Sequence, residues 1–476
     1  MTSPAAFIRR HPLVIPLAVC AALNAAVLLA VAARHPEYLR DYRTNPNPDA
    51  PHYVLLGRNV FLHGAYSRSA EPPFVTDIFR TPGYPVFAGG LDLLGGAGLI
   101  YAVQALLHLG LCALTYALAR RAFGPRAGFV SALLVAVHPT LLALNVQAMS
   151  ETAFLFLLAA GVLALMAGLP PAAAPRRLDL AAGVLLGLAT LVRPAGLYLP
   201  LMLAAVLAVA VARADGFRRA ARRSLTFVAG VAVCLAPWVA RNYAVFGTAT
   251  LTTNDTVVLV YFTGAGAYQL HHGVDRETAS AMIAREFGLH PPEDMWNYHA
   301  TGDSPVAMDR QARRAVVPVL TRYPLDLCRS CALGLVKSFF SHDAGTWARI
   351  LDLPGWVAPG TGGLLTLRPD AWGRLLGNHP FLIAVFVAQL LLSAALVLLA
   401  AAGAVRAVRR GGAPAYLVLC LLGFFALVCA ASGVDAYTRF SAPILPFACV
   451  LAGSAWAARR GAPAPRNAPA REFVAC

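Results

Sequence analysis

The feature that most constrains this chain is a series of long apolar segments without charged residues. The first, residues 11–33, lies between Arg10 and Arg34 and has 23 consecutive uncharged positions. Because about 20 apolar residues in a helix cross the roughly 30 Å hydrocarbon core of a bilayer, this segment predicts a membrane-spanning helix. No convincing small-residue cleavage site follows it, which favours an uncleaved first span over a signal peptide.

Nine further apolar segments predict about ten spans, within a range of 8–12. They are residues 94–119, 127–144, 152–169, 179–192, 195–212, 225–240, 380–403, 414–432 and 441–458. The chain is 58% hydrophobic and 13% charged, whereas soluble domains are about 45–50% apolar and about 25% charged. The predicted fold class is an all-α polytopic membrane protein, and disordered, collagen-like and disulfide-rich secreted proteins are excluded.

Positive charge is concentrated in alternate connections between these segments. The formal net charge is +16, and every basic residue except Lys337 is an arginine. If the side rich in arginine is cytoplasmic, the positive-inside rule is satisfied with both termini inside, which predicts a multi-pass protein of the cytoplasmic (inner) membrane. Nineteen arginines lie on this side: Arg9, Arg10, Arg120, Arg121, Arg126, Arg176, Arg177, Arg213, Arg218, Arg219, Arg222, Arg223, Arg406, Arg409, Arg410, Arg459, Arg460, Arg466 and Arg471.

Two long segments, 34–93 and 241–378, then lie on the outer side and hold most of the acidic residues. A helix at 325–341 is apolar, but an eleventh span there would move the Arg406–Arg410 cluster outside, so it is predicted to be interfacial or re-entrant. Residues 291–311 are predicted to form an irregular loop. The predicted organisation is a transmembrane module at 1–245, an outer loop region at 246–378, C-terminal transmembrane helices at 379–460 and a cytoplasmic tail at 461–476.

A carboxylate in the first outer segment stands in a defined local context. Asp49 precedes Pro51 in a helical stretch that Gly64 would end, and Tyr53 follows one turn later on the same face. One interpretation is that Asp49 only caps this helix. The other is that its carboxylate lies at the lipid–water boundary and takes a proton from an acceptor hydroxyl.

Arg80 and Tyr84 belong to the sequence RTPGYP, in which two prolines and a glycine fix a rigid turn. Arg80 could bind a phosphate at headgroup depth, or both residues could be ordinary interfacial anchors. Glu151 opens the fourth apolar segment. An ionisable group at that depth indicates a functional site, although the helix dipole alone would also favour an acid there.

The spacing of Arg177 and Arg193 is the clearest geometric indication. The fifteen residues between them form about 22 Å of helix at 1.5 Å per residue, which is shorter than the bilayer core. Arg193 is therefore expected to end below the outer surface and to need an acid or a lipid phosphate as a partner, unless its side chain snorkels to the surface.

Three more cations stand near outer ends of apolar segments. Arg241 follows Trp238 in PWVARN, Arg439 follows Asp435, and Lys337 lies in the 325–341 helix. The lone lysine indicates either a requirement for a compact ammonium group or a chance remnant in an arginine-rich chain.

The nine cysteines are scattered, mostly within apolar runs, and the only close pair, Cys328 and Cys331, is interpreted as neighbouring thiols on a helix. His271 and His272 could bind a metal with an outer acid, but adjacent side chains point in different directions. No cofactor is predicted, and a divalent metal has only this weak support. Walker and dinucleotide-binding motifs are absent from the sequence.

Taken in order, these segments resemble a known family. The motifs are DxxxY from Asp49, RxPGYP from Arg80, SET around Glu151, LVRP ending at Pro194, PWxxRN around Arg241 and RFxxPxxP from Arg439 to Pro446. Their order and spacing resemble bacterial GT-C glycosyltransferases of the family 39 type, which are similar to protein O-mannosyltransferases and to the aminoarabinose transferase of lipid A. The similarity covers residues 10–245 well and 430–455 moderately, whereas 250–375 shows little.

This resemblance implies a GT-C-like architecture and the inverting transfer of a hexosyl or pentosyl group from a polyprenyl-phosphate carrier to a hydroxyl acceptor on the outer membrane face. The acceptor could be a glycan, a lipid or a protein. Asp49 corresponds to the catalytic aspartate of loop one, and Ala50 stands where eukaryotic-type mannosyltransferases have a second acid. The implied substrate-binding residues are Tyr53, Tyr84 and Glu151 in the pocket and Arg80, Arg193, Arg241, Lys337 and Arg439 on the departing phosphate.

Two other classes of protein are consistent with the same residues. A transporter or flippase of a lipid-linked sugar would need the arginines but not Asp49 as a base, and a scaffold of an envelope-synthesis complex would need no single outer acid. A polyprenyl phosphate is a good leaving group once cations meet its charge. A transferase would therefore use both the arginines and Asp49, and it is the favoured class.

Overall fold

The computed structural model describes residues 11–45, 47–169, 176–297, 304–341, 343–359, 364 and 368–459. These residues form helices and loops, and the single β-bridge among them joins Ser67 to Thr76. The predicted tail at 461–476 lies outside the described residues. Ten helices form a bundle: α2 (Val14–Arg34), α5 (Gly83–Phe123), α6 (Pro125–Val137), α8 (Glu151–Gly168), α9 (Arg176–Val192), α10 (Leu199–Asp215), α11 (Phe217–Phe246), α22 (Pro380–Arg410), α23 (Ala413–Ala430) and α25 (Leu445–Arg459).

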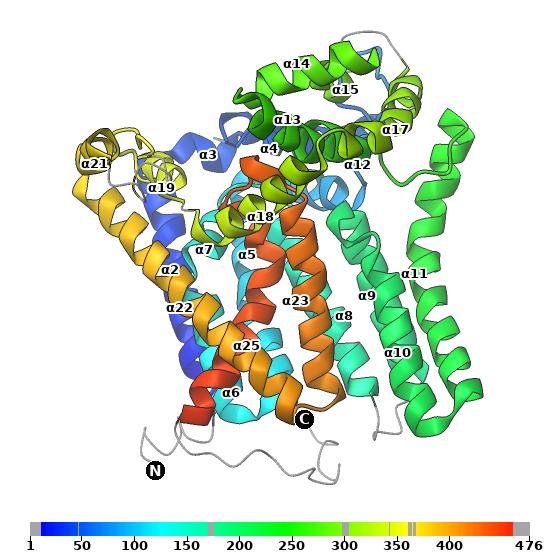
Figure 1. Cartoon of the computed structure of the whole chain (residues 1–476), viewed down its shortest axis with the longest axis vertical. Helices are drawn as coiled ribbons and strands as arrows, with labels where there is room; N and C mark the ends of the chain where they lie inside the picture. The colour runs from blue at the N-terminus through cyan, green and yellow to red at the C-terminus, as the bar shows by residue number, and fades with distance from the viewer. Residues whose placement is uncertain are drawn as a thin grey trace.

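Shorter helices gather at one end of this bundle (Figure 1). They are α3 (Pro36–Arg40), η1 (Tyr42–Thr44), α4 (Asp49–His63), α7 (Pro139–Leu144), η2 (Pro194–Gly196), α12 (Asn254–Val258), η3 (Leu259–Gly264), α13 (Ala265–His272), α14 (Arg276–Phe287), α15 (Pro292–Trp296), α17 (Pro305–Arg322), α18 (Pro324–Phe340), α19 (Ala344–Ile350), α21 (Pro369–Leu376), η4 (Gly433–Asp435), α24 (Thr438–Ser441) and η5 (Ala442–Ile444).

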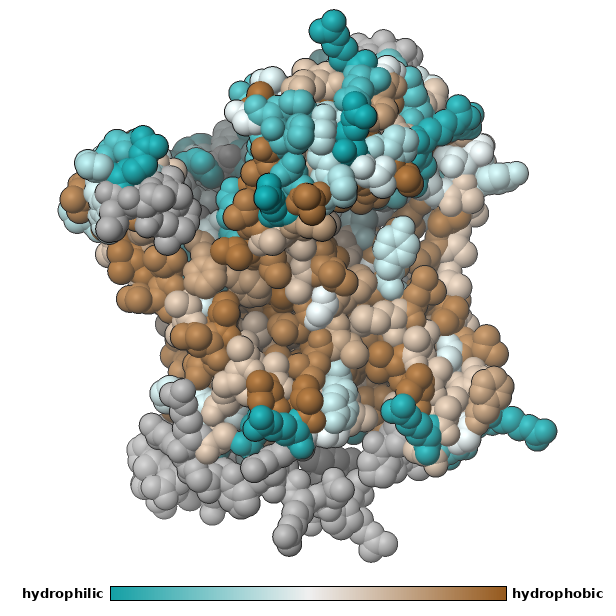
Figure 2. All heavy atoms as spheres, viewed as in Figure 1, coloured by the Kyte–Doolittle hydropathy of each residue, from teal (hydrophilic) through white to brown (hydrophobic). Residues whose placement is uncertain are grey.

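The bundle has the surface of a membrane protein. Figure 2 shows an apolar belt across the visible face of the bundle, with hydrophilic residues concentrated beyond it. Eight helices in the described part of the chain are long and apolar enough to cross a membrane, while α6 and α9 have 13 and 17 residues. Every predicted span overlaps one of the ten bundle helices, which confirms the predicted fold class. Eight helices in the described residues are long enough to cross a membrane.

Two local predictions are corrected. The predicted span 127–144 is broken at His138, where the backbone is extended, because Pro139 disfavours a helical residue before it and starts α7. The predicted loop at 291–311 contains α15 and the start of α17. Helix α17 forms there because Ser304 accepts a hydrogen bond from the Ala307 N–H and Pro305 occupies the first turn.

Helix α18 occupies the 325–341 segment and lies obliquely at the end of the bundle that also holds α4 and α13 (Figure 1). It packs against α13, α23 and the η4 turn. This placement agrees with an interfacial helix rather than an eleventh span.

Helix α4 rests directly on the first part of α5. A Cβ added at Gly57 would overlap the Pro85 carbonyl, and one added at Gly89 would overlap the backbone of Gly57. The two backbones therefore touch where the helices cross, as small residues allow in membrane proteins. Helix α5 is then interrupted at Gly95 and Gly96, where Gly96 has φ 69°, before it continues through the bundle.

Candidate active site

Helix α4 presents the Asp49 carboxylate without using it as a cap. Asp49 is the first residue of the helix, and its backbone N–H donates to Oδ1 of Asn47 at 3.1 Å. The interpretation of Asp49 as the helix cap is wrong, because the cap position is Pro48 and no side chain caps the helix. The Asp49 carboxylate pairs with Arg80 and Arg439 instead.

Five charged side chains form a continuous chain of ion pairs around Asp49. Oδ1 of Asp49 accepts from Nη2 of Arg80 at 2.7 Å, and Oδ2 accepts from Nη1 of Arg439 at 2.8 Å. Arg439 also donates through Nε to Oε1 of Glu151, whose same oxygen lies 2.7 Å from Nη1 of Arg193. Residues from α4, α8, α24 and two loops therefore meet at one place.

The loop that carries Arg80 is held by its own backbone contacts. Asp77 accepts from the backbone N–H groups of Phe79 and Arg80, and the hydroxyl of Tyr66 donates to the Arg80 carbonyl at 3.0 Å. The guanidinium then donates to the Tyr53 hydroxyl at 3.0 Å and stands 4.7 Å from the centre of that ring. Arg80 is therefore fixed toward α4 before any ligand arrives.

Tyr84 lies behind Tyr53 as a buried support. The two rings meet edge to face with centroids 5.1 Å apart. The Tyr84 hydroxyl donates to Oε1 of Gln104 at 2.7 Å, and Gln104 donates to the carbonyl of Asn145 at 2.9 Å. Tyr84 thus shapes the pocket through Tyr53, and its own hydroxyl is occupied within the fold.

Glu151 is fully buried at the start of α8. Arg193, at the break between α9 and η2, contacts both Glu151 and the hydroxyl oxygen of Ser150, the latter at 3.1 Å. Arg193 thereby has the acidic partner that its depth requires. Oε2 of Glu151 is buried and has no hydrogen-bond partner in the described part of the chain.

The five residues of this ion-pair chain carry one uncompensated positive charge, since three guanidinium groups face two carboxylates. Burial alone would raise the pKa of Asp49, but the charges of Arg80 and Arg439 outweigh it and hold that pKa well below its ordinary range. Asp49 is therefore ionised near neutral pH. The surplus positive charge favours an anionic ligand and disfavours a divalent cation at this place.

A cavity of about 250 Å³ opens beside the Asp49–Arg439 pair. It is lined by Asn47, Pro48, Asp49, Thr140, Ala143, Leu144, Gln147, Asp343, Thr346, Arg349, Tyr437, Thr438 and Arg439. The lining includes carboxylate, amide, hydroxyl and guanidinium groups, which suits a polyhydroxylated ligand better than an apolar one.

Asp343 is a lining residue that the sequence interpretation missed. Oδ2 of Asp343 accepts from the Thr140 hydroxyl at 2.6 Å and from Nε2 of Gln389 at 2.7 Å. Burial raises the pKa of this carboxyl, against the effect of its hydrogen bonds. No motif in the 250–375 segment distinguished Asp343 from an ordinary aspartate before a short helix. Such an aspartate commonly caps the helix, but the Asp343 side chain makes no cap hydrogen bond.

Two predicted phosphate ligands lie outside the ion-pair chain. Arg241 donates to the Asp77 carbonyl at 2.9 Å and stands 4.7 Å from the Trp238 ring centre. Lys337 donates to the carbonyl of Val434 in the η4 turn. The structure brings together Asp49, Tyr53, Arg80, Tyr84, Glu151, Arg193 and Arg439, whereas these two cations contact backbone carbonyls nearby in the fold.

His271 and His272 do not form a metal centre with a third ligand. The His271 ring stacks on Tyr323 at 3.8 Å and its Nδ1 lies 3.1 Å from Oδ2 of Asp326, while His272 contacts the Tyr323 hydroxyl. The two imidazole planes are 87° apart, as expected for adjacent residues. Within the described ranges, the one group of three suitable ligands is elsewhere, at Cys20, His108 and Cys112.

Comparisons with known proteins agree with this architecture. Residues 86–243 match the model of the dolichyl-phosphate-mannose-protein mannosyltransferase family. The segment includes Glu151, Arg193 and Arg241 but neither Asp49 nor Arg439. The search of curated proteins gave no significant match.

Solved structures match nearly the whole chain. The oligosaccharyltransferase AglB from Archaeoglobus fulgidus matches in complex with an inhibitory peptide and a dolichol-phosphate, at 14% identity and TM-score 0.50, over 95% of this chain and 50% of that chain. The same enzyme tethered to an acceptor peptide matches at 12% identity and TM-score 0.52, again over 95% and 50%. ArnT from Cupriavidus metallidurans bound to undecaprenyl phosphate matches at 16% identity and TM-score 0.43, over 94% and 77%.

The chain thus spans about half the length of the AglB chains it matches, and at these identities the likeness concerns the fold. The predicted resemblance is confirmed at that level. The chain has the fold of these Archaeoglobus fulgidus oligosaccharyltransferase structures, and its residues 86–243 match the model of the dolichyl-phosphate-mannose-protein mannosyltransferase family.

Proposed function

We propose that this protein is a membrane glycosyltransferase that moves a hexosyl or pentosyl group from a polyprenyl-phosphate carrier to a hydroxyl of a glycan, lipid or protein acceptor. The observation that supports it most is the ion-pair chain, in which Asp49 lies between two arginines beside a polar cavity. A carboxylate and an anion-binding group at one place are what transfer from a phosphate leaving group requires.

The surplus positive charge suits the donor. A sugar linked through a phosphodiester carries one negative charge, and the five-residue chain has one positive charge in excess. The donor phosphate competes with Asp49 for Arg80 and Arg439. Phosphate binding therefore releases the carboxylate from the pairs that make it a weak base, so that Asp49 becomes a stronger base once the donor is bound.

The reaction is then a single displacement. Asp49 takes the proton of the acceptor hydroxyl, whose oxygen forms a bond to the anomeric carbon while the bond from that carbon to the phosphate oxygen breaks. Polyprenyl phosphate leaves with the electron pair, and the guanidinium groups stabilise its growing charge. Attack opposite the leaving group inverts the anomeric configuration. Glu151 contributes by pairing with Arg193 and Arg439, which holds Arg439 beside Asp49.

The proposed orientation places this site on the outer face of the cytoplasmic membrane with both termini inside. The start of α2 and the end of α25 lie at the end of the bundle opposite α4 (Figure 1). The α10–α11 connection and the end of α22, both rich in arginine, lie at that same end, as the positive-inside rule requires for a cytoplasmic side.

Replacement of Asp49 by Asn tests the catalytic proposal. We expect sugar transfer from labelled polyprenyl phosphate to fall by about 10²–10⁴-fold, the usual contribution of a general base, while donor binding is retained because Arg80 and Arg439 lose a competing anion. Glu277→Asn, on the outer helix α14, is the control and should transfer normally.

Full transfer by the Asp49→Asn protein would contradict the assignment of the base. Translocation of the lipid-linked sugar without transfer, in wild-type and variant alike, would favour the transporter or flippase instead.

A further inference from the structure

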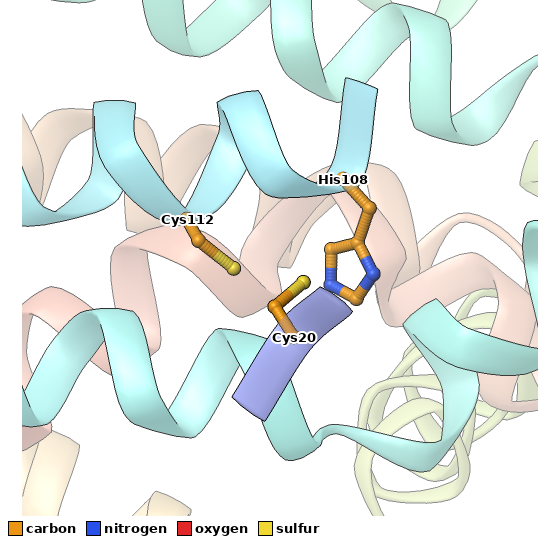
Figure 3. Close-up of side chains that lie close together, drawn as sticks. All are labelled: Cys20, His108 and Cys112. Atoms are coloured by element: carbon orange, nitrogen blue, oxygen red, sulfur yellow. The ribbon is translucent and has the colours of Figure 1, made fainter. Parts of the chain in front are cut away.

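A second cluster of reactive side chains lies inside the helical bundle and shares no residue with the ion-pair chain. Cys20 is on α2, and His108 and Cys112 are four residues apart on α5, on one face of that helix. The two Sγ atoms and an imidazole nitrogen lie within 4.8 Å of one another. Figure 3 shows the three side chains directed toward one another between the helices.

The cluster is shielded from solvent, since no member is more than 1% exposed. Asn24 approaches it from α2, with Nδ2 at 3.4 Å from the Cys20 Sγ and 3.2 Å from Nδ1 of His108. Asn145 approaches the same Nδ1 at 3.0 Å, and Nε2 of His108 contacts the Val135 carbonyl at 3.1 Å. Both ring nitrogens are therefore held, which fixes the plane of the imidazole.

Such surroundings resemble the outer shell of a metal site. A histidine that binds a metal through one ring nitrogen is commonly oriented by a hydrogen bond at the other nitrogen. At His108, an ion bound through Nδ1 would replace the contacts with Asn24 and Asn145, while Nε2 would continue to donate to the Val135 carbonyl and orient the ring.

The donor set and its charge select the kind of ion. Two cysteine sulfurs and an imidazole suit zinc and other thiophilic metals and are poor ligands for Mg²⁺ or Ca²⁺. Binding of a divalent ion displaces the two thiol protons, and one ion with two thiolates and a neutral imidazole has no net charge. A monovalent ion with two thiolates would leave a negative charge inside the apolar bundle, where unpaired charge is expensive.

We propose that Cys20, His108 and Cys112 bind one zinc ion that joins α2 to α5. Three protein ligands are the number found in zinc sites that keep a fourth position for a small ligand. The ion would hold α2 against α5 and would take no part in the proposed transfer reaction.

Metal analysis of the full-length protein in detergent tests this proposal. The protein is treated with a chelator, reloaded with zinc chloride, freed of excess metal and analysed for zinc per chain. We expect about one equivalent in the wild type and at least a 10-fold lower content in the Cys20→Ser, Cys112→Ser double variant, since removal of ligands weakens binding strongly. Cys420→Ser, on α23 and outside the cluster, should retain one equivalent.

A reloaded wild type without stoichiometric zinc, or a double variant that retains it, would overturn the proposal. A copper-loaded and zinc-free protein would also overturn it. Because the double variant could fail to fold, the wild type is also loaded with Co²⁺, for which we expect thiolate-to-cobalt charge transfer and intense tetrahedral d–d absorption. The absence of both absorptions in folded, cobalt-treated wild type would refute thiolate coordination.

Discussion

At the scale of single residues, the site depends on which polar groups compensate one another. Asp49 forms ion pairs with Arg80 and Arg439. Glu151 forms ion pairs with Arg439 and Arg193. The sequence indicated each of these residues by its local context, Asp49 and Arg80 within the first outer segment and the others as charges near the ends of apolar segments. It could not indicate the pairings, because the partners Asp49 and Arg439 are 390 positions apart and no local pattern links them.

The half-buried Asp343 leads to a prediction about pH. Its pKa is raised by burial, so its contribution to stability is present below the ordinary aspartate pKa and is lost as pH rises through the raised value. We therefore expect Asp343→Asn to raise the apparent unfolding temperature by about 1–3 °C at pH 8, with the difference shrinking toward pH 4. Thermal unfolding followed by tryptophan fluorescence measures this.

Asp326→Asn provides the matched control. The pKa of Asp326 is lowered, mainly by its hydrogen bond with His271, so its charged form stabilises the native state above the ordinary aspartate pKa. This variant should be no more stable than the wild type at pH 8. A gain in stability of Asp343→Asn that is equal at pH 4 and pH 8 would contradict the assigned titration.

At the scale of secondary-structure elements, the site depends on how closely α4 approaches α5. The helices touch through Gly57 and Gly89, and Asp49 lies about two turns before Gly57 on α4. The position of α4 therefore sets the distance from Asp49 to Arg439, which comes from α24 at the other end of the sequence.

The crossing of α4 and α5 predicts a strong effect of a small substitution. Gly89→Ala forces the backbones apart because its Cβ has no space, and we expect a cost of about 1–3 kcal/mol and a loss of transfer activity of about 10²-fold from displacement of Asp49. Gly423→Ala, within helix α23 where an added Cβ meets nothing within 4 Å, should retain activity. The transfer assay and thermal unfolding measure both variants.

An active Gly89→Ala protein with unchanged stability would show that α4 does not depend on this contact. Full stability with lost activity would instead show that the crossing serves mainly to place Asp49.

At the scale of the whole molecule, the outer helices and the turn before the last bundle helix meet at one end of the bundle. The outer helices α13 and α18 contact the η4 turn just before Arg439, with Gln269 donating to Asp435 at 2.7 Å and Lys337 to the Val434 carbonyl. The 250–375 segment, which shows little similarity to the family in sequence, thus supports a residue of the site.

The proposed orientation predicts the accessibility of one thiol. Cys328 on α18 is the exposed cysteine among the described residues and lies at the end of the bundle that holds the site (Figure 1). A membrane-impermeant maleimide should label the protein in intact spheroplasts, and Cys328→Ser should abolish that labelling. Labelling of Cys328 only after lysis would place this end in the cytoplasm and contradict the proposal.

The sequence alone determined the class of fold and the approximate place of every bundle helix. Hydrophobic segments must cross the bilayer as helices, since backbone groups have no other partners there. It also predicted that Arg193 stops short of the membrane surface, because helix length follows from residue count.

Only the tertiary structure decided which residues meet. It joined Asp49 to Arg80 and Arg439, directed Lys337 and Arg241 to backbone carbonyls, added Asp343 to the cavity and brought Cys20 to His108 and Cys112. These contacts depend on how helices distant in sequence pack, and the packing is set by small residues such as Gly89 and by breaks such as Gly96. The apolar periodicity of the chain places helices in the membrane but does not specify which of their faces meet.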